Sequence, residues 1–138
     1  MFIPVDGAIQ NGTFITKNLY GVIEIKGNYR NGKPHGKFTQ YFFSTDKNEN
    51  KVEYEANYYK GKLDGHVVQY YENGNKEWES NYTNGVQDGK SNQYYENGNL
   101  EMELNFKNGN LTGKKIQYYE NGKIELVNNY SPINSKNE

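Results

Sequence analysis

One short phrase recurs at a constant interval along the chain. Gln-Tyr-Tyr-Glu-Asn-Gly begins at Gln69, Gln93 and Gln117, 24 residues apart each time. A catalytic site is normally used once in a domain, so a phrase copied together with its neighbourhood indicates a repeat architecture first and an activity only indirectly. The same register aligns further aromatic and glycine residues: Tyr82, Phe106 and Tyr130, then Gly85 and Gly109, then Gly89 and Gly113.

The register also extends towards the N-terminus. Tyr58 and Gly61 lie one period before Tyr82 and Gly85. The copy before that, which begins at Tyr29, fits only with a spacing of 29 residues. The five extra residues fall in the polar stretch 44–51, where a longer hairpin loop costs little free energy.

Each period predicts a β-hairpin. Asn-Gly is the strongest short-range signal for a two-residue hairpin turn, because both central residues need positive φ. We therefore expect two-residue turns at Asn73-Gly74 and its equivalents. The following strand alternates Trp78, Ser80 and Tyr82 with polar residues, which predicts an apolar face and an opposite face that carries the glutamates.

The turn also predicts the register of the hairpin. A two-residue turn places Tyr71 opposite Lys76 and Gln69 opposite Trp78. The second tyrosine of each pair then joins the apolar face, and the first stands on the glutamate face. A shift of one residue would exchange the two tyrosines.

No long stretch has helical periodicity, so the predicted fold class is all-β. We expect a single domain of 138 residues, a meander of tandem hairpins of about 24 residues that forms one elongated, twisted or rolled antiparallel sheet of about ten strands. Its predicted parts are an irregular N-terminal cap hairpin (1–28), the hairpin repeats (29–130) and a C-terminal tail (131–138).

Composition narrows the function classes. Lys and Arg number 16 against 17 for Asp and Glu, so the net charge of -1 gives no overall attraction to nucleic acid or to anionic lipid. The chain has no apolar run long enough to span a bilayer and no signal-like N-terminus, which predicts a cytoplasmic protein. It also has no cysteine, so neither a disulfide framework nor a thiolate metal site is expected, and the redox compartment cannot be read from the sequence. Nucleotide-binding loops and catalytic triad spacings are also absent, so neither a cofactor nor an enzymatic activity is expected.

The consensus GK-x3-YYENG-[NK]-x2-E-x3-[YF]-x-NG-x3-G resembles the bacterial MORN-repeat variant over Tyr29 to Tyr130. The resemblance implies tandem β-hairpins, and it implies a binding, scaffolding or antitoxin-like role. The family has no fixed functional residues to transfer. The membrane role of its eukaryotic relatives is not carried over, because the sequence lacks the basic surface that such contact needs.

The repeat also aligns carboxylates with tyrosines. The candidate partner-binding residues are the glutamate columns and the first tyrosine of each pair: Glu53, Glu77, Glu101 and Glu125, Glu55, Glu79 and Glu103, and Tyr70, Tyr94 and Tyr118. Equivalent residues on alternate strands lie about 9 to 10 Å apart, so such a ladder would dock a surface rich in Lys and Arg. The simpler interpretation is a solvated face that keeps the sheet soluble.

Other chemistry is less well supported. A carbohydrate hydrolase needs two carboxylates in different environments, and a repeated column gives nearly equal ones. His35 and His66 occupy different columns, so they are interpreted as turn or strand-edge histidines and no metal site is expected. Asp64 and Asp88 precede glycines and read as turn residues.

We therefore predict a non-enzymatic protein-binding module. Its role would be that of a small inhibitor or antitoxin-like protein, which neutralises a toxin, nuclease or defence effector by masking a basic surface. The alternatives are a structural scaffold or surface-exposed repeat protein and, more remotely, a carbohydrate-active enzyme. The expected partner is another protein, without direct contact to nucleic acid or membrane. An open sheet also predicts homodimerisation through the edge segments Phe14 to Lys17 or Ile124 to Tyr130.

Overall fold

The computed structural model describes residues 10–131, and every regular element in that range is a β-strand. Residues 1–9 of the predicted cap and residues 132–138 of the predicted tail lie outside the described range. The strands are β1 (Gly12–Lys17), β2 (Ile23–Arg30), β3 (Lys33–Pro34), β4 (Gly36–Tyr41), β5 (Val52–Tyr59), β6 (Lys62–Tyr70), β7 (Lys76–Thr83), β8 (Val86–Tyr94), β9 (Leu100–Lys107), β10 (Asn110–Leu111), β11 (Gly113–Tyr118) and β12 (Ile124–Tyr130).

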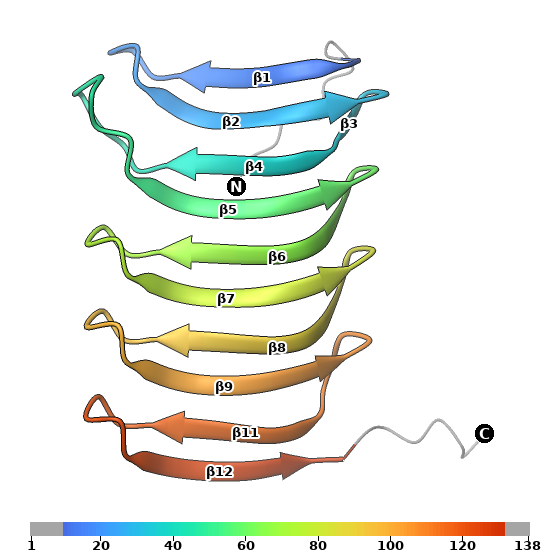
Figure 1. The fold of residues 1–138 in the computed structure, drawn as a ribbon, viewed down its shortest axis with the longest axis vertical. Helices are drawn as coiled ribbons and strands as arrows, with labels where there is room; N and C mark the ends of the chain where they lie inside the picture. The colour runs from blue at the N-terminus through green and yellow to red at the C-terminus, as the bar shows by residue number, and fades with distance from the viewer. Residues whose placement is uncertain (1–9, 132–138) are drawn as a thin grey trace.

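The strands form one antiparallel sheet in which neighbours follow the order of the chain (Figure 1). The path runs β1-β2-β4-β5-β6-β7-β8-β9-β11-β12, and the two-residue strands β3 and β10 extend the pairing of β2 and β9. The predicted all-β meander of hairpins is confirmed, including its count of about ten strands. Within the described residues β1 and β12 are the two edges of an open sheet, so each repeat packs chiefly on its neighbours in sequence.

Two kinds of turn alternate along this meander. At one end of the strands, two residues that both have positive φ connect the paired strands. Positive φ at both central residues is the property of a type I′ hairpin turn, which matches the twist of the strands it joins. These turns are Asn31-Gly32, Lys60-Gly61, Asn84-Gly85 and Asn108-Gly109.

The Glu-Asn-Gly turns at the other end are longer than predicted. The Tyr71 N–H donates to the Asn75 carbonyl at 2.8 Å and the Gly74 N–H donates to the Tyr71 carbonyl at 2.9 Å. Only Gly74 has positive φ, at 91°. The turn is therefore a three-residue loop with a glycine bulge, and the predicted two-residue turn is wrong. Asn73 fits this loop because its side-chain oxygen accepts the Asn75 N–H at 2.9 Å.

A β-bulge follows each of these turns. Gln69 lies opposite Trp78, as predicted, but the residue opposite Lys76 is Tyr70, so Glu77 has no partner in the ladder. The predicted pairing of Tyr71 with Lys76 is wrong for this reason. An extra residue in one strand reverses the face on which the residues beyond it stand. The same shift leaves three further residues unpaired: Glu53, Glu101 and Glu125.

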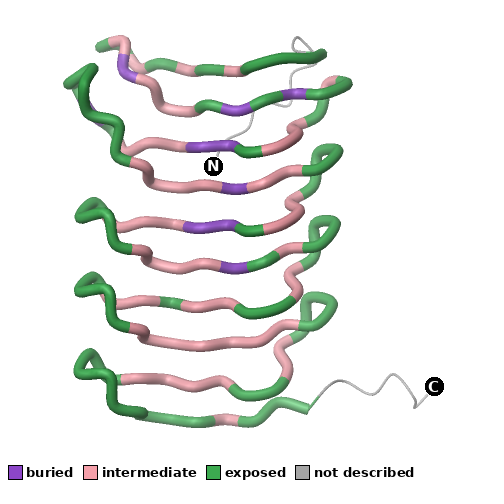
Figure 2. The backbone as a smooth tube through the Cα atoms, in the orientation of Figure 1, coloured by how far each residue is buried: buried purple, intermediate pink, exposed green. Residues whose placement is uncertain are grey.

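The buried side chains gather in the first half of the sheet (Figure 2). Phe38 is fully buried, and its ring centroid lies 5.8 Å from that of Tyr29 and 5.3 Å from that of Tyr58, both edge to face. In β6, Val67 and Val68 are both buried although they point to opposite faces, so both faces shield the middle of the sheet there. Among the described residues, none after Ser80 is buried.

Candidate functional site

The two predicted glutamate columns stand on opposite faces of the sheet. Glu53 accepts a hydrogen bond from Gln40 Nε2 at 2.8 Å, whereas Glu55 lines a recess together with Thr39. Thr39 and Gln40 are consecutive residues of β4 and point to opposite faces. The prediction of one shared glutamate face is wrong, because the bulge turns the Glu53 column away from the Glu55 column.

The two faces differ in chemistry. The face of Gln40 also carries Tyr54 and Trp78, whose ring centroids lie 6.2 Å apart, and we call it the aromatic face. The opposite face carries the column of Glu55, Glu79 and Glu103, and we call it the tyrosine-glutamate face.

Glu79 is the centre of a closed network on the tyrosine-glutamate face. Its carboxylate accepts hydrogen bonds from Lys76 Nζ at 2.7 Å and from the Tyr94 hydroxyl at 2.5 Å, and His66 Nε2 lies at 2.9 Å. Burial acts to raise the pKa of Glu79, but the hydrogen bonds from Lys76, Tyr94 and His66 outweigh it and lower the pKa to about 2. The carboxylate therefore stays ionised and is committed to partners within the chain.

The other members of this column are committed in the same way. The Tyr118 hydroxyl donates to Glu103 at 2.5 Å, and this hydrogen bond, together with burial, raises the pKa of Tyr118. Glu55 forms an ion pair with Lys37 at 2.6 Å. The prediction that the first tyrosine of each pair stands among glutamates is confirmed for Tyr94 and Tyr118.

The other column consists of the bulge residues, which lie near the Glu-Asn-Gly turns. Glu77, Glu101 and Glu125 have no hydrogen-bond or ion-pair partner among residues 10–131. Glu24 belongs to the same column, because it is the unpaired residue between Ile23 and Ile25 and shares a recess with Glu53. The sequence prediction missed Glu24, although the 29-residue spacing that relates Tyr29 to Tyr58 also relates Glu24 to Glu53.

The bulge column and the turns together make one strongly acidic border. Each Glu-Asn-Gly turn adds an exposed glutamate a few residues from the bulge glutamate. We call this border the acidic edge, and its members are Glu72, Glu77, Glu96, Glu101, Glu120 and Glu125. Equivalent members on successive repeats lie about 9 to 10 Å apart, because two strand spacings separate them.

Hydrogen bonds between repeats hold this spacing. The Tyr71 hydroxyl donates to the Tyr94 carbonyl at 2.8 Å, and the Tyr95 hydroxyl donates to the Tyr118 carbonyl at 2.6 Å. Asn73 and Asn75 both donate to the carbonyl of the next turn, at 2.8 and 2.9 Å. Burial, followed by the charges of the surrounding glutamates, raises the pKa of Tyr71 and of Tyr95, which keeps both hydroxyls protonated as donors.

The opposite ends of the strands carry the other sign of charge. This second border consists of the type I′ turns and the strand residues beside them. Its basic side chains include Arg30, Lys33, Lys60, Lys62 and Lys107. The carboxylates there accept backbone N–H groups, from Asn84 to Asp64 at 3.1 Å and from Asn108 to Asp88 at 3.2 Å. The near-zero net charge therefore conceals a sheet with one acidic and one basic border.

The ten predicted site residues are thus not one surface. Glu55, Glu79 and Glu103 lie with Tyr94 and Tyr118 on the tyrosine-glutamate face, while the bulge glutamates lie beside the turns. Tyr70 stands opposite Lys76, beside the Glu-Asn-Gly turn. The structure brings the bulge glutamates together instead with the turn glutamates Glu72, Glu96 and Glu120, which the sequence prediction left out.

Residues 10–131 contain no group of three or more histidine or carboxylate side chains placed to hold a metal ion. The same range contains no helix of the length and apolarity needed to cross a bilayer.

The architecture defined by these hairpins is that of a tandem β-hairpin repeat protein, stacked through its turns. The chain belongs to the MORN repeat variant family, whose sequence model matches three consecutive repeats at residues 63–84, 87–108 and 111–131. MORN repeats are non-catalytic modules that typically bind proteins or membranes. No curated protein matches the chain.

Proposed function

We propose that this protein is a non-enzymatic protein-binding module that docks the basic surface of a partner protein through its acidic edge. The partner class we favour is a toxin, nuclease or defence effector, since proteins that bind nucleic acid present the Lys- and Arg-rich surfaces that an acidic border complements. Inhibition would follow from occupation of that surface, without catalysis.

One observation carries the proposal: the bulge glutamates Glu77, Glu101 and Glu125 are spaced regularly and have no hydrogen-bond or ion-pair partner among residues 10–131. Glu79 already has three partners, so its charge is largely neutralised within the chain. Glu77 and Glu101 are half-buried and Glu125 is exposed, and all three lie in a row that the stacked turns hold in place. Because the backbone holds these charges at a regular spacing, the row needs no rearrangement of the fold on binding and favours fast, salt-dependent association.

The test is a charge-neutralising triple variant, E77Q/E101Q/E125Q, compared with the wild type in affinity capture from the source cell and in titration of the captured partner. We expect capture to be lost and the affinity to fall by about tenfold or more at low salt, with a smaller loss at high salt. If the partner is a nuclease or toxin, the wild type should inhibit it stoichiometrically.

The chain offers a matched control, T83K/N84K/V86K. It makes the same change in net charge at the opposite border, and each new lysine reproduces a residue that another repeat carries in that column: Lys107, Lys60 and Lys62. The control should bind the partner like the wild type. Equal binding by the glutamine variant would exclude the acidic edge as the docking surface, and a captured partner that retains its activity would favour a scaffold over an inhibitor.

A further inference from the structure

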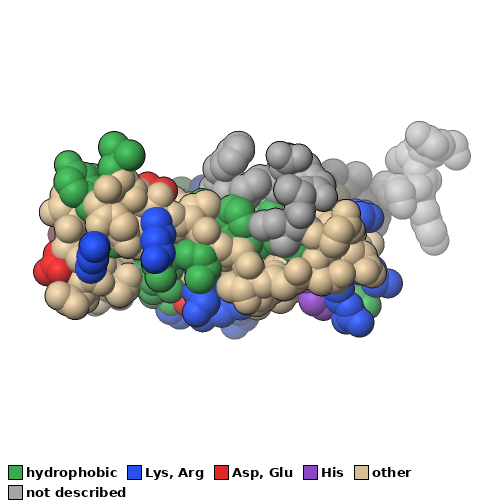
Figure 3. Space-filling view, turned by 90° about the horizontal axis from the view of Figure 1, so that it is seen from above, with side chains coloured by type: hydrophobic (Ala, Val, Ile, Leu, Met, Phe, Trp, Pro, Cys, Tyr) green, Lys and Arg blue, Asp and Glu red, His purple; other side chains and the backbone are tan. Residues whose placement is uncertain are grey.

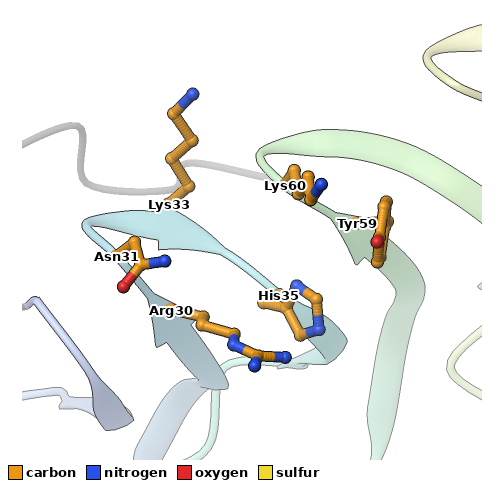
Figure 4. A pocket seen from close by; sticks show the side chains of 6 residues that line it. All are labelled: Arg30, Asn31, Lys33, His35, Tyr59 and Lys60. Carbon is orange, nitrogen blue, oxygen red and sulfur yellow. The ribbon is translucent and has the colours of Figure 1, made fainter.

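The basic border contains a recess that the proposed function does not use. It encloses about 540 Å³ between the first type I′ turn and the end of β5 (Figure 4). Six residues line it: Arg30, Asn31, Lys33, His35, Tyr59 and Lys60. None of them is acidic, whereas three are lysine or arginine and a fourth is a histidine.

Two of these side chains, His35 and Lys60, lie against the Tyr59 ring. The His35 and Tyr59 ring centroids are 5.2 Å apart with their planes at 46°, and Lys60 Nζ lies 5.2 Å from the Tyr59 centroid. The Arg30 side chain extends towards His35, while Lys33 extends away from the others (Figure 4). Figure 3, which looks onto the β1 end, shows a histidine with Lys and Arg side chains beside it at this end of the strands.

Comparison with the later repeats shows that the fold does not require this charge. His35 occupies the column of Asp64 and Asp88, and Lys60 occupies the column of Asn84 and Asn108. In the later repeats the aspartate accepts the backbone N–H of the asparagine one turn further on, at 3.1 and 3.2 Å.

Between the first and second copies an imidazole thus stands in place of the carboxylate, and an ammonium group stands in place of the amide. Lys60 keeps the left-handed backbone of the asparagines, with φ at 49° against 50° at Asn84. A lysine is less suited than asparagine to that conformation. Two substitutions that weaken the turn and both add positive character need a reason other than folding.

We propose that the recess formed by Arg30, His35, Tyr59 and Lys60 binds the phosphate group of a phosphomonoester. The planar guanidinium of Arg30 matches two phosphate oxygens, and Lys60 and His35 offer donors for the rest of a dianion. A single carboxylate would satisfy the arginine alone, so three basic groups around one opening favour an anion of higher charge. The site is independent of the acidic edge, which lies at the other end of the strands.

The test titrates inorganic phosphate into the full chain at low salt and follows backbone amide shifts by NMR, with sodium chloride as the ionic-strength control. We expect saturable shifts centred on residues 30–35 and 59–61. The decisive variant is H35D/K60N, which restores the residues of the later repeats and should fold at least as well as the wild type. It should weaken phosphate binding by about tenfold or more.

K123D is the charge-matched control, since it changes the net charge by the same amount at the other border and Lys123 is exposed. It should bind phosphate within about twofold of the wild type. Shifts that sodium chloride reproduces, or equal phosphate binding by H35D/K60N, would overturn the proposal, as would an equal loss of binding in K123D.

Two further probes distinguish the source of the phosphate. Saturable binding of O-phosphoserine that H35D/K60N abolishes would identify a soluble phosphomonoester. Cosedimentation with vesicles that carry a phosphoinositide, but not with phosphatidylcholine vesicles, would identify a lipid headgroup if H35D/K60N abolishes it. Vesicle binding that H35D/K60N leaves unchanged would contradict this recess as the site.

Discussion

Among the glycines of the described sheet, Gly27 has the least room for a side chain, because it lies against the Phe38 ring. Gly27 does not have positive φ, so its backbone conformation does not by itself exclude alanine. The neighbouring ring leaves no room for a side chain at this position, because a Cβ at Gly27 would lie 2.3 Å from Phe38 Cε1 and 2.6 Å from Phe38 Cγ. Carbon atoms in contact normally lie about 3.5 to 4.0 Å apart, so the ring would have to move by more than about 1 Å.

The cost of Gly27→Ala follows from the burial of that ring. Phe38 is fully buried between Tyr29 and Tyr58, so it has no free space to enter. Overpacking of this kind costs about 1 to 3 kcal/mol, and we take the upper half of the range because the contact is so short. Replacing glycine also restricts the unfolded chain, which returns about 0.4 to 1 kcal/mol. The net loss is about 2 kcal/mol, or roughly 6 to 8 °C in Tm.

The assay is a double-mutant cycle with Phe38→Val, measured by urea and thermal unfolding. The double variant G27A/F38V reproduces the Ala56 and Val67 pair that the next repeat places at the same positions. Gly27→Ala should therefore be neutral or slightly stabilising in the F38V background, with a coupling free energy of about 2 kcal/mol. A G27A protein within about 0.5 kcal/mol of the wild type, or an equal cost in both backgrounds, would refute the steric argument.

Three other predictions concern hydrogen bonds, pH and the sheet edge. Tyr71→Phe removes the 2.8 Å hydrogen bond to the Tyr94 carbonyl and should cost about 1 kcal/mol in urea unfolding, whereas Tyr119→Phe, at a half-exposed ring without such a bond among the described residues, should cost close to nothing. Because the pKa of Glu79 is lowered from 4.5 to about 2, its contribution to stability is present above about pH 4.5 and is lost as the pH falls to about 2. The difference in unfolding free energy between the wild type and Glu79→Gln should therefore shrink over that pH window. A constant difference would contradict the network. At the edge strand β12, Leu126 and Val127 are 46% and 42% exposed, and we expect the wild type to self-associate there. The variant L126K/V127E puts charges on this edge, and its second change restores the residue type of the Glu79 and Glu103 column. It should sediment as a monomer at concentrations where the wild type does not.

The repeat predicted the fold because its signals are redundant. Fixed spacing, Asn-Gly turns and alternating side chains each predict a meander of hairpins, and they agree across several copies. The turn types were harder to predict, since Asn-Gly occurs at both ends of the strands. Asn84 adopts positive φ and forms a two-residue turn, whereas Asn73 does not and forms a three-residue turn. Asparagine suits either conformation, so the dipeptide alone does not decide between them.

The candidate site was predicted only in part, and the bulge is the reason. Simple alternation places Glu77 and Glu79 on one face, and it would be right for an uninterrupted strand. The extra residue at Glu77 interrupts the alternation, so Glu77 and Glu79 stand on opposite faces. No residue type in the sequence is specific for such a β-bulge. A three-residue turn and a bulge together kept Gln69 opposite Trp78, so the predicted register was correct in the strand and wrong beside the turn.

A repeat protein separates folding from function in a way that a single-copy domain does not. A residue that recurs along the repeats, such as the tyrosine at 71 and 95, is explained by the hydrogen bond that it donates to the next repeat. A residue whose type differs from that at the equivalent position of the other repeats is not explained by such a hydrogen bond. His35 and Lys60 depart from their columns together and line one recess, whereas the departure of Val127 lies at an edge strand. If departures mark function, reverting His35 and Lys60 should strengthen the fold while removing a binding property, and the same reversal at Val127 should change only self-association.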